Sequence, residues 1–262
     1  MKDLKVLADE VCEIAKRVGV FLREERKVFS LDSVERKSEH DYVSYVDKTA
    51  EVMLVEELAK LLPEAGFITE EDTVEKSTKT LNWIIDPLDG TTNYIQDLAP
   101  YCISIALRDG DDLLIGVVYE VCLDECFAAW QDGGAFLNGR QIQVSAKPLN
   151  QALIGLDLPY KAEEYKPALL RLVDELCGKV TSLRLNGSAA MSLCYVAAGR
   201  YDGWMEAFLK PWDFSAGVLI VREAGGRVTD YNGSEQIQNK HHVLASNGVI
   251  HEELLKILPA YM

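Results

Sequence analysis

The segment from Trp83 to Tyr94 constrains the fold of this chain more than any other stretch of its sequence. Leu81–Ile85 is a short apolar run that ends in β-branched residues, which predicts a buried strand. Pro87 has no amide hydrogen to donate, so we expect the hydrogen-bond ladder of the strand to stop there. Gly90 permits a tight turn, and Thr91–Asn93 is typical of the first residues of a helix. The sequence therefore predicts a strand, a turn and a helix start in immediate succession.

Two acids, Asp86 and Asp89, lie within this segment at the predicted strand end. Carboxylates on a rigid strand end suit a hard cation such as Mg²⁺, and the amides at a helix start suit a phosphate group. One short segment would then supply both parts of a phosphatase site. The alternative interpretation is a loop in which the acids only cap the helix.

The complete segment resembles the signature of the inositol monophosphatase family, which comprises Mg²⁺-dependent, lithium-sensitive sugar phosphatases. Further stretches are similar to motifs of the same family. Thr69 stands where the family usually has glycine, and Ser44 replaces the commoner threonine. The similar stretches are Phe67–Glu71 (F-I-G-E-E in the family), Asp41–Asp47 (D-x-V-T-x-x-D), Gly187–Ala190 (G-[ST]-A-A) and Trp212–Gly217 (W-D-x-A-A-G). The resemblance covers about Lys37 to Gly226.

Charge and cysteine content narrow the class of protein. The chain has 262 residues with 42 acidic and 27 basic side chains, for a formal net charge of −15. Direct binding of nucleic acid is not expected, because it needs a basic face.

The six cysteines include no C-x-x-C pair and indicate free thiols in a reducing compartment. With no signal peptide or membrane-spanning run in the sequence, we expect a soluble, cytoplasmic protein.

Hydrophobic periodicity divides the chain into two halves. The first half predicts a long helix to about Arg26, a second helix after Asp47, and an antiparallel sheet. Residues 28–46 between the helices predict a loop or a frayed hairpin. From about residue 148, strands and helices alternate. We therefore expect an α+β sub-domain at 1–147 and an α/β sub-domain at 148–262 within one structural unit. The resemblance implies the αβαβα layered sandwich of sugar phosphatases, with an antiparallel N-terminal and a mixed C-terminal sheet.

The resemblance also implies a set of metal ligands for two or three Mg²⁺ ions. These ligands are Glu70, Asp86, the backbone carbonyl of Leu88, Asp89 and Asp213. Mg²⁺ takes several oxygen ligands in near-octahedral geometry, and a pair of such ions clamps the attacking and leaving oxygens of an in-line displacement. The family places Asp86 between both ions.

Catalytic roles in the family match Asp47, Glu70 and Thr91. Thr91 would orient the attacking water, with Asp47 behind it, and Lys37 would support a further water near the site. Read without the resemblance, Asp47 predicts only the N-cap of the second helix.

Substrate contacts complete the set that the resemblance implies. The phosphate side comprises Gly90, Thr91 and Thr92, and the alcohol side comprises Asp89, Gly187, Ser188, Ala189, Glu206 and Asp213. For Gly187–Ala190, a helix start that merely packs on the sheet remains an equal alternative.

We therefore expect a Mg²⁺-dependent phosphomonoesterase that acts on an inositol monophosphate or a similar polyol phosphate. Histidinol phosphate, fructose 1,6-bisphosphate and phosphoadenosine phosphate remain alternative substrates, although Thr91–Asn93 favours the inositol branch over the last two. A regulatory, protein-binding member of the family is the alternative of another class. A homodimer is the family default.

Overall fold

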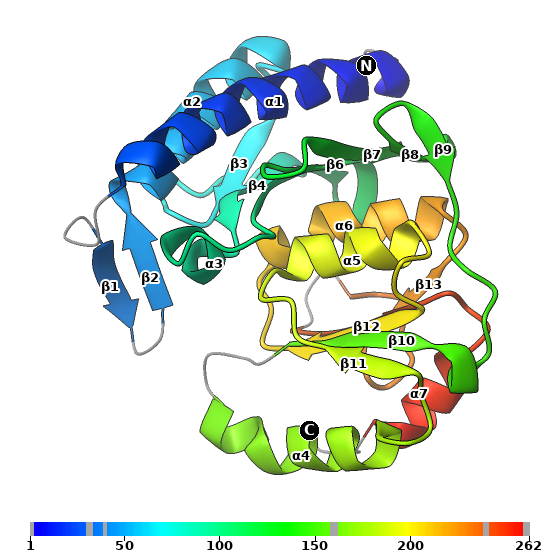
Figure 1. Ribbon diagram of the computed structural model, residues 1–262. Helices are drawn as coiled ribbons and strands as arrows, with labels where there is room; N and C mark the ends of the chain where they lie inside the picture. Colours follow the sequence, from blue (N-terminus) through cyan, green and yellow to red (C-terminus); the bar gives the residue numbers. More distant parts are fainter. Residues whose placement is uncertain (1–2, 30–33, 39–40, 158–161, 238–240, 259–262) are drawn as a thin grey trace.

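Helices and sheets alternate in layers through the molecule (Figure 1). The computed structural model describes residues 3–29, 34–38, 41–157, 162–237 and 241–258. Helices α1 (Leu4–Val28) and α2 (Tyr45–Leu61) form the outer layer at one side. Helices α5 (Ala189–Ala197) and α6 (Pro211–Glu223) lie between two sheets, and α4 (Ala162–Leu176) and α7 (His251–Ile257) cover the far side. This is the predicted αβαβα sandwich.

The first sheet contains the strands of the N-terminal half. They are β3 (Gly66–Thr69), β4 (Leu81–Asp89), β5 (Cys102–Asp109), β6 (Asp112–Glu120), β7 (Glu125–Trp130), β8 (Gly134–Leu137) and β9 (Arg140–Ile142), which pair in this order. The pairs from β4 to β9 are antiparallel, as expected. The exception is β3, which runs parallel to β4 because Glu70–Thr80 crosses back to the same end of the sheet.

Side chains of this sheet alternate between two cores, as the period of a strand requires. Trp83 and Ile85 of β4 pack with α1 and α2, whereas Ile84 packs with α5 and α6. Asp86 follows in the same alternation and therefore faces the central helix layer. Gly116 lets α6 come close, since an added Cβ there would lie 2.5 Å from the carbonyl oxygen of Ala216.

The second sheet belongs to the C-terminal half and is mixed, as expected. Its strands are β10 (Leu153–Leu156), β11 (Ser182–Arg184), β12 (Gly203–Ala207), β13 (Arg227–Thr229) and β14 (His242–Ser246), in the order β11-β10-β12-β14-β13. β10 is parallel to β11 and β12, while β14 is antiparallel to its neighbours. The boundary at residue 147 stays a prediction.

One local detail differs from the sequence prediction. Pro87 does not end β4, because the strand continues to Asp89 through an irregularity in which Asp86 pairs with Ser104 and Asp89 with Cys102. A proline that lacks an amide donor fits such a bulge. Two other local predictions are confirmed. The stretch between the first two helices contains a hairpin, in which β1 (Val34–Ser38) pairs with β2 (Asp41–Ser44), and a helix does begin at Thr91, as the short α3 (Thr91–Ile95).

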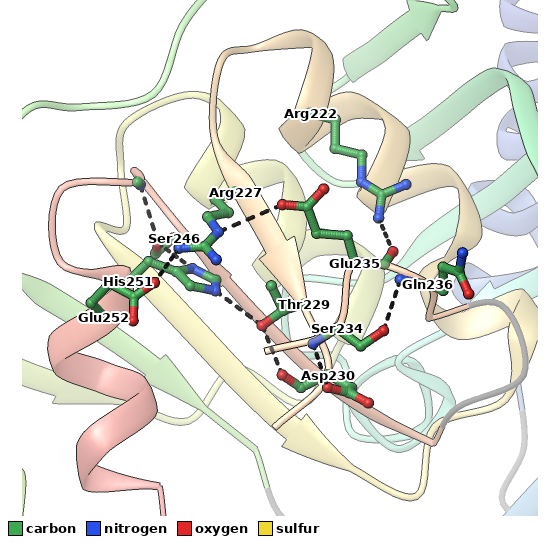
Figure 2. Close-up of polar contacts among 11 residues, drawn as sticks. Arg222, Arg227, Thr229, Asp230, Ser234, Glu235, Gln236, Ser246, His251 and Glu252 are labelled. Atoms are coloured by element: carbon green, nitrogen blue, oxygen red, sulfur yellow. Dashed lines mark hydrogen bonds and ion pairs between the residues drawn. The ribbon is translucent and has the colours of Figure 1, made fainter. Parts of the chain in front are cut away.

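A buried histidine joins the last helix to the second sheet (Figure 2). Nε2 of His251 lies 3.0 Å from Thr229 Oγ1, and Nδ1 lies 2.8 Å from Ser246 Oγ. The Thr229 hydroxyl donates its hydrogen bond to the carbonyl of Asp230, so its oxygen accepts a hydrogen bond from Nε2–H of His251. Nδ1 is then unprotonated and acts as an acceptor. Burial, and then the charge of Arg227, lower the pKa of His251 to about 4. The network therefore holds a neutral imidazole.

His251 makes the free energy of unfolding depend on pH. Between its ordinary pKa of 6.5 and about 4, the unfolded chain binds a proton there that the folded chain does not, so stability falls as the pH drops through this window. Urea unfolding at about pH 7.5 and about pH 5 measures how much the free energy of unfolding falls between the two. This fall should be smaller for His251→Gln than for the wild type. The exposed His241→Gln is the control, and an equal loss in both variants would contradict the assignment.

Candidate active site

The end of β4 is tied to the start of α6. Asp86 pairs with Ser104 across β4 and β5, and the Ser104 hydroxyl donates to the carbonyl of Trp212 at 3.1 Å. Asp213, the next residue, is the third residue of α6. The helix begins at Pro211, with Lys210 as its N-cap residue. Oδ2 of Asp213 accepts a hydrogen bond from the amide of Lys210 at 2.6 Å and so gives this helix-terminal amide a partner. Asp86 and Asp213 are thereby brought to one corner.

Glu70 reaches the same corner from the end of β3. Its amide donates to the carbonyl of Ile85 at 3.3 Å. The loop that follows is held by Glu51, a fully buried residue of α2, which accepts from the amides of Glu71 (2.7 Å) and Thr73 (2.8 Å) and from the Thr73 hydroxyl. Sequence reasoning missed Glu51. The signal was a charged residue four positions after Asp47, on the apolar face of a helix.

Asp47 joins the start of α2 to Thr91. Its Oδ2 accepts from the amide and hydroxyl of Ser44 at 2.9 and 2.7 Å, and its Oδ1 lies 3.3 Å from Thr91 Oγ1. The predicted N-cap role of Asp47 is wrong, because Ser44 is the N-cap and Asp47 completes a capping box at the third helical position. The Ser-x-x-Asp spacing was the available signal. Thr91 Oγ1 also donates to the carbonyl of Leu88 at 3.0 Å.

The loop before α5 meets the site at Asp89. Oδ2 of Asp89 accepts from the Ser188 hydroxyl at 2.5 Å and from the amide of Ala190 at 2.8 Å. The hydroxyl of Ser188 also caps α5. The Gly187–Ala190 stretch is therefore a helix start, and it also contacts Asp89. Ala189 is the first residue of α5, and Gly187, two residues earlier, has a φ of +73° that favours glycine.

Two more residues that sequence reasoning passed over organise this loop. The amide group of Asn93, on α3, donates to the carbonyls of Pro100 (2.8 Å) and Asn186 (2.9 Å). Asp157 accepts from the amides of Asn186 and Gly187, both at 2.8 Å. An acid directly after a buried strand was the signal for Asp157, and the motif position was the signal for Asn93.

The remaining predicted residues take different places. Gly90 has a φ of +88° and precedes α3, Thr92 is exposed on α3, and Glu206 is half-buried on β12. Lys37 belongs to β1, but its side chain lies outside the described residues.

Four carboxylates act on one another electrostatically at this corner. Burial raises the pKa of Asp86 well above its ordinary range, and the charges of Glu70, Asp89 and Asp213 raise it further. Burial also raises the pKa of Asp89 to about 6, against the hydrogen bonds from Ser188 and Ala190, which lower it. The pKa of Asp213 rises through burial and then through the charge of Glu70. Ionising this group without a cation therefore costs free energy.

The pKa of Glu206 is raised in the same way. Burial is the main cause, followed by the charges of Asp157, Asp213 and Asp89. Glu206 therefore lies within electrostatic reach of the same corner, on the side of the second sheet.

This donor set fits Mg²⁺ in chemistry. It consists of oxygens alone, which hard divalent cations prefer, and in the described part of the chain no ion pair involves Asp86, Asp89 or Asp213. One oxygen of each of these three acids accepts a protein hydrogen bond. Across the described residues, no three His, Cys, Asp or Glu side chains already form a closed metal cluster. A cation would therefore have to draw the remaining carboxylate oxygens together.

Comparison with known proteins agrees with this architecture. The profile of the inositol monophosphatase family matches residues 3–262. The chain belongs to the inositol monophosphatase family. Family membership supports a phosphatase.

Relatives carry two kinds of name. The chain is 40% identical to Nus factor SuhB of Escherichia coli K12 over 220 residues, which cover 82% of each chain. It is 39% identical to an inositol-1-monophosphatase of Mesorhizobium japonicum over 225 residues, covering 85% of each. Among solved structures, the IMPase of Thermotoga maritima matches with a TM-score of 0.88 and 31% identity, over 95% of both chains. The suhB protein of Bartonella henselae matches with a TM-score of 0.88 and 35% identity, over 95% of this chain and 97% of that chain.

No helix among the described residues has the length and apolar character needed to cross a membrane.

The repulsion around Asp86 makes a prediction about thermal stability. Asp86→Asn should raise Tm in EDTA, because it removes a buried charge while its side-chain oxygen can still accept from Leu88 N at about the 2.9 Å seen now. The same variant should lose the stabilisation by Mg²⁺, which amounts to about 2.7 kcal/mol at a hundred times Kd. Thermal melts with and without Mg²⁺ measure both effects.

The matched control for this prediction is Glu120→Gln. Glu120 is another buried acid whose pKa is raised by burial, but it is the last residue of β6. Its variant should keep the full response to Mg²⁺. An unchanged Mg²⁺ response in Asp86→Asn would contradict the proposed cation site.

Proposed function

We propose that the chain is a Mg²⁺-dependent phosphomonoesterase that hydrolyses an inositol monophosphate or a similar polyol phosphate. The observation that carries this proposal is the group of mutually repelling carboxylates around Asp86, directly beside the Asp47–Thr91 contact. The family that the chain belongs to and its inositol-1-monophosphatase relatives support the same activity.

In this proposal, the Mg²⁺ ions are held by Glu70, Asp86, the Leu88 carbonyl, Asp89 and Asp213. When bound, Mg²⁺ supplies charge for the phosphate, activation of water and stabilisation of the leaving alkoxide. The raised pKa values of Asp86, Asp89 and Asp213 support the assignment, because bound cations would offset the burial and the carboxylate repulsion that raise them.

Thr91 and Asp47 act on the attacking water. A threonine hydroxyl has a single proton to donate, and Thr91 Oγ1 lies near both Leu88 O (3.0 Å) and Asp47 Oδ1 (3.3 Å). A cation on the Leu88 carbonyl would leave Asp47 as the acceptor. The Thr91 oxygen can then accept a proton from the water while its own proton passes to Asp47 Oδ1. Ser44 keeps the other oxygen of Asp47 occupied and so fixes the orientation of the carboxylate.

Backbone amides bind the phosphate in this proposal, and side chains on the opposite side bind the alcohol. The first amides of a helix have no acceptor within it, and those of Gly90, Thr91 and Thr92 stand beside Asp89 in the chain. α3 spans only five residues, so the amides themselves matter more than any helix dipole. Glu206 and the Gly187–Ala189 loop form the alcohol side.

A phosphate-release panel tests the substrate class. It compares inositol 1-phosphate, fructose 1,6-bisphosphate, phosphoadenosine phosphate and histidinol phosphate, each with Mg²⁺ and with EDTA. We expect the highest kcat/KM for inositol 1-phosphate and no release in EDTA. Preference for another phosphate would reassign the substrate, and release in EDTA would remove the role of the metal.

Variants of Thr91 test the proton path. Thr91→Ala should lower kcat by about 10²–10⁴, the range for a positioned proton-transfer group, and should leave Mg²⁺ affinity nearly unchanged. Thr91→Ser keeps the hydroxyl and is the matched control, with most of the activity retained. Equal kcat for Thr91→Ala and the wild type would displace Thr91 from this role.

The second candidate function is a regulatory role through a protein partner. The 40% identity to proteins named Nus factor SuhB favours it. Phosphate release by the wild type discriminates between the two, because a purely protein-binding role requires none. The homodimer, the lithium sensitivity and the cytoplasmic location stay predictions.

A further inference from the structure

Asp157 is a buried acid with hydrogen bonds on both carboxylate oxygens. It follows β10 directly and is 7% exposed. Oδ1 accepts from the amides of Asn186 and Gly187, both at 2.8 Å, and Oδ2 accepts from Trp204 Nε1 at 3.0 Å and from Ser192 Oγ at 3.2 Å. It therefore connects β10 and β12 to the loop that precedes α5.

The peptide between Asn186 and Gly187 is held from two sides. Asp157 binds its amide and the amide before it, while the side chain of Asn93 binds the Asn186 carbonyl at 2.9 Å. Gly187 adopts the left-handed conformation here, which the two restraints maintain. Asn93 lies on α3, shortly after β4 of the first sheet, and Asp157 follows β10 of the second sheet, so the loop is fixed relative to both sheets.

The residues after this peptide face the site. Ser188 Oγ and the amide of Ala190 bind Asp89, and their positions follow from that of Gly187. The charge of Asp157 is the second cause, after burial, that raises the pKa of Glu206. Asp157 therefore lies next to the residues proposed to contact the substrate alcohol, which are Glu206 and the Gly187–Ala189 loop.

We propose that Asp157 is a positioning residue that fixes the Asn186–Ala190 loop and thereby sets recognition of the alcohol part of the substrate. The inference rests on the proposed phosphatase function and deepens it. Asp157 acts through the loop and not on the substrate, since within the described part of the chain both of its carboxylate oxygens already accept hydrogen bonds from protein groups. Loss of Asp157 then affects a polyol phosphate more than a phosphate ester that has no hydroxyls.

The other end of β10 offers a matched control. Asp202 is fully buried and accepts from the amide of Leu153 at 2.7 Å and from the hydroxyl of Ser145. Asp202 is thus a buried acid that, like Asp157, accepts hydrogen bonds from protein groups, but it contacts the first residue of β10, whereas Asp157 follows the last. Asp202→Ala removes a comparable set of hydrogen bonds away from the Asn186–Ala190 loop.

The kinetic experiment compares inositol 1-phosphate with p-nitrophenyl phosphate, an aryl ester without hydroxyls. For Asp157→Ala, we expect KM for inositol 1-phosphate to rise about tenfold or more, as for other supporting residues of a site. The kcat/KM for the aryl ester should stay within about twofold. Asp202→Ala should change both substrates alike. Equal loss on both substrates in Asp157→Ala would overturn the proposal.

Hydrogen exchange supplies a readout that does not depend on turnover. The peptide covering residues 186–190 should exchange faster in Asp157→Ala than in the wild type and in Asp202→Ala. Unchanged exchange there would overturn the positioning role. If the wild type released no phosphate from either ester, the proposed function would fail, and exchange alone would decide the role of Asp157.

Asp157→Asn serves if the alanine variant does not fold. Asparagine keeps one acceptor oxygen, so it can bind the loop amides or Trp204 but not both. We expect the same direction of change in KM and in exchange, at a smaller size. An asparagine variant equal to the wild type in both measurements would overturn the proposal.

Discussion

Repulsion among the carboxylates around the buried Asp86 is the constraint on which the rest of this structure depends. Burial and the charges of neighbouring carboxylates raise the pKa of Asp86, Asp89 and Asp213, and Glu70 supplies one of the charges that act on Asp86 and Asp213. Such a group is unfavourable in a fold unless a cation or a reaction uses it. The surrounding structure must therefore hold these acids together against their own charge.

The scaffold does this with short, directed contacts between layers. The bulge at Pro87 brings Asp86 and Asp89 to one strand end, and Ser104 ties that end to the start of α6. Glu51 holds the loop after Glu70 from the outer helix layer. The hydrogen bonds of Asp89 to Ser188 and Ala190 then join the first sheet to the central helices. The site is thus assembled at the junction of all the inner layers.

The sequence was sufficient for features that depend on pattern or on motif. The short apolar, β-branched run predicted the strand around Ile84, and the motif resemblance pointed to the acids that the structure brings together. The sequence alone was insufficient where a tertiary contact decides between two local conformations. Pro87 could stop a strand or shape a bulge, and only pairing with β5 selects the bulge. Glu51 and Asp157 were missed because several of their partners are backbone amides, which leave no trace in residue identity.

The most direct test of the account is a crystal structure of the protein grown with Mn²⁺, which takes the same oxygen ligands as Mg²⁺ and scatters anomalously. The account predicts an anomalous peak within about 2.0–2.3 Å of carboxylate oxygens of Asp86 and of at least one further acid among Glu70, Asp89 and Asp213. An anomalous map without a peak between these side chains at saturating Mn²⁺ would contradict it.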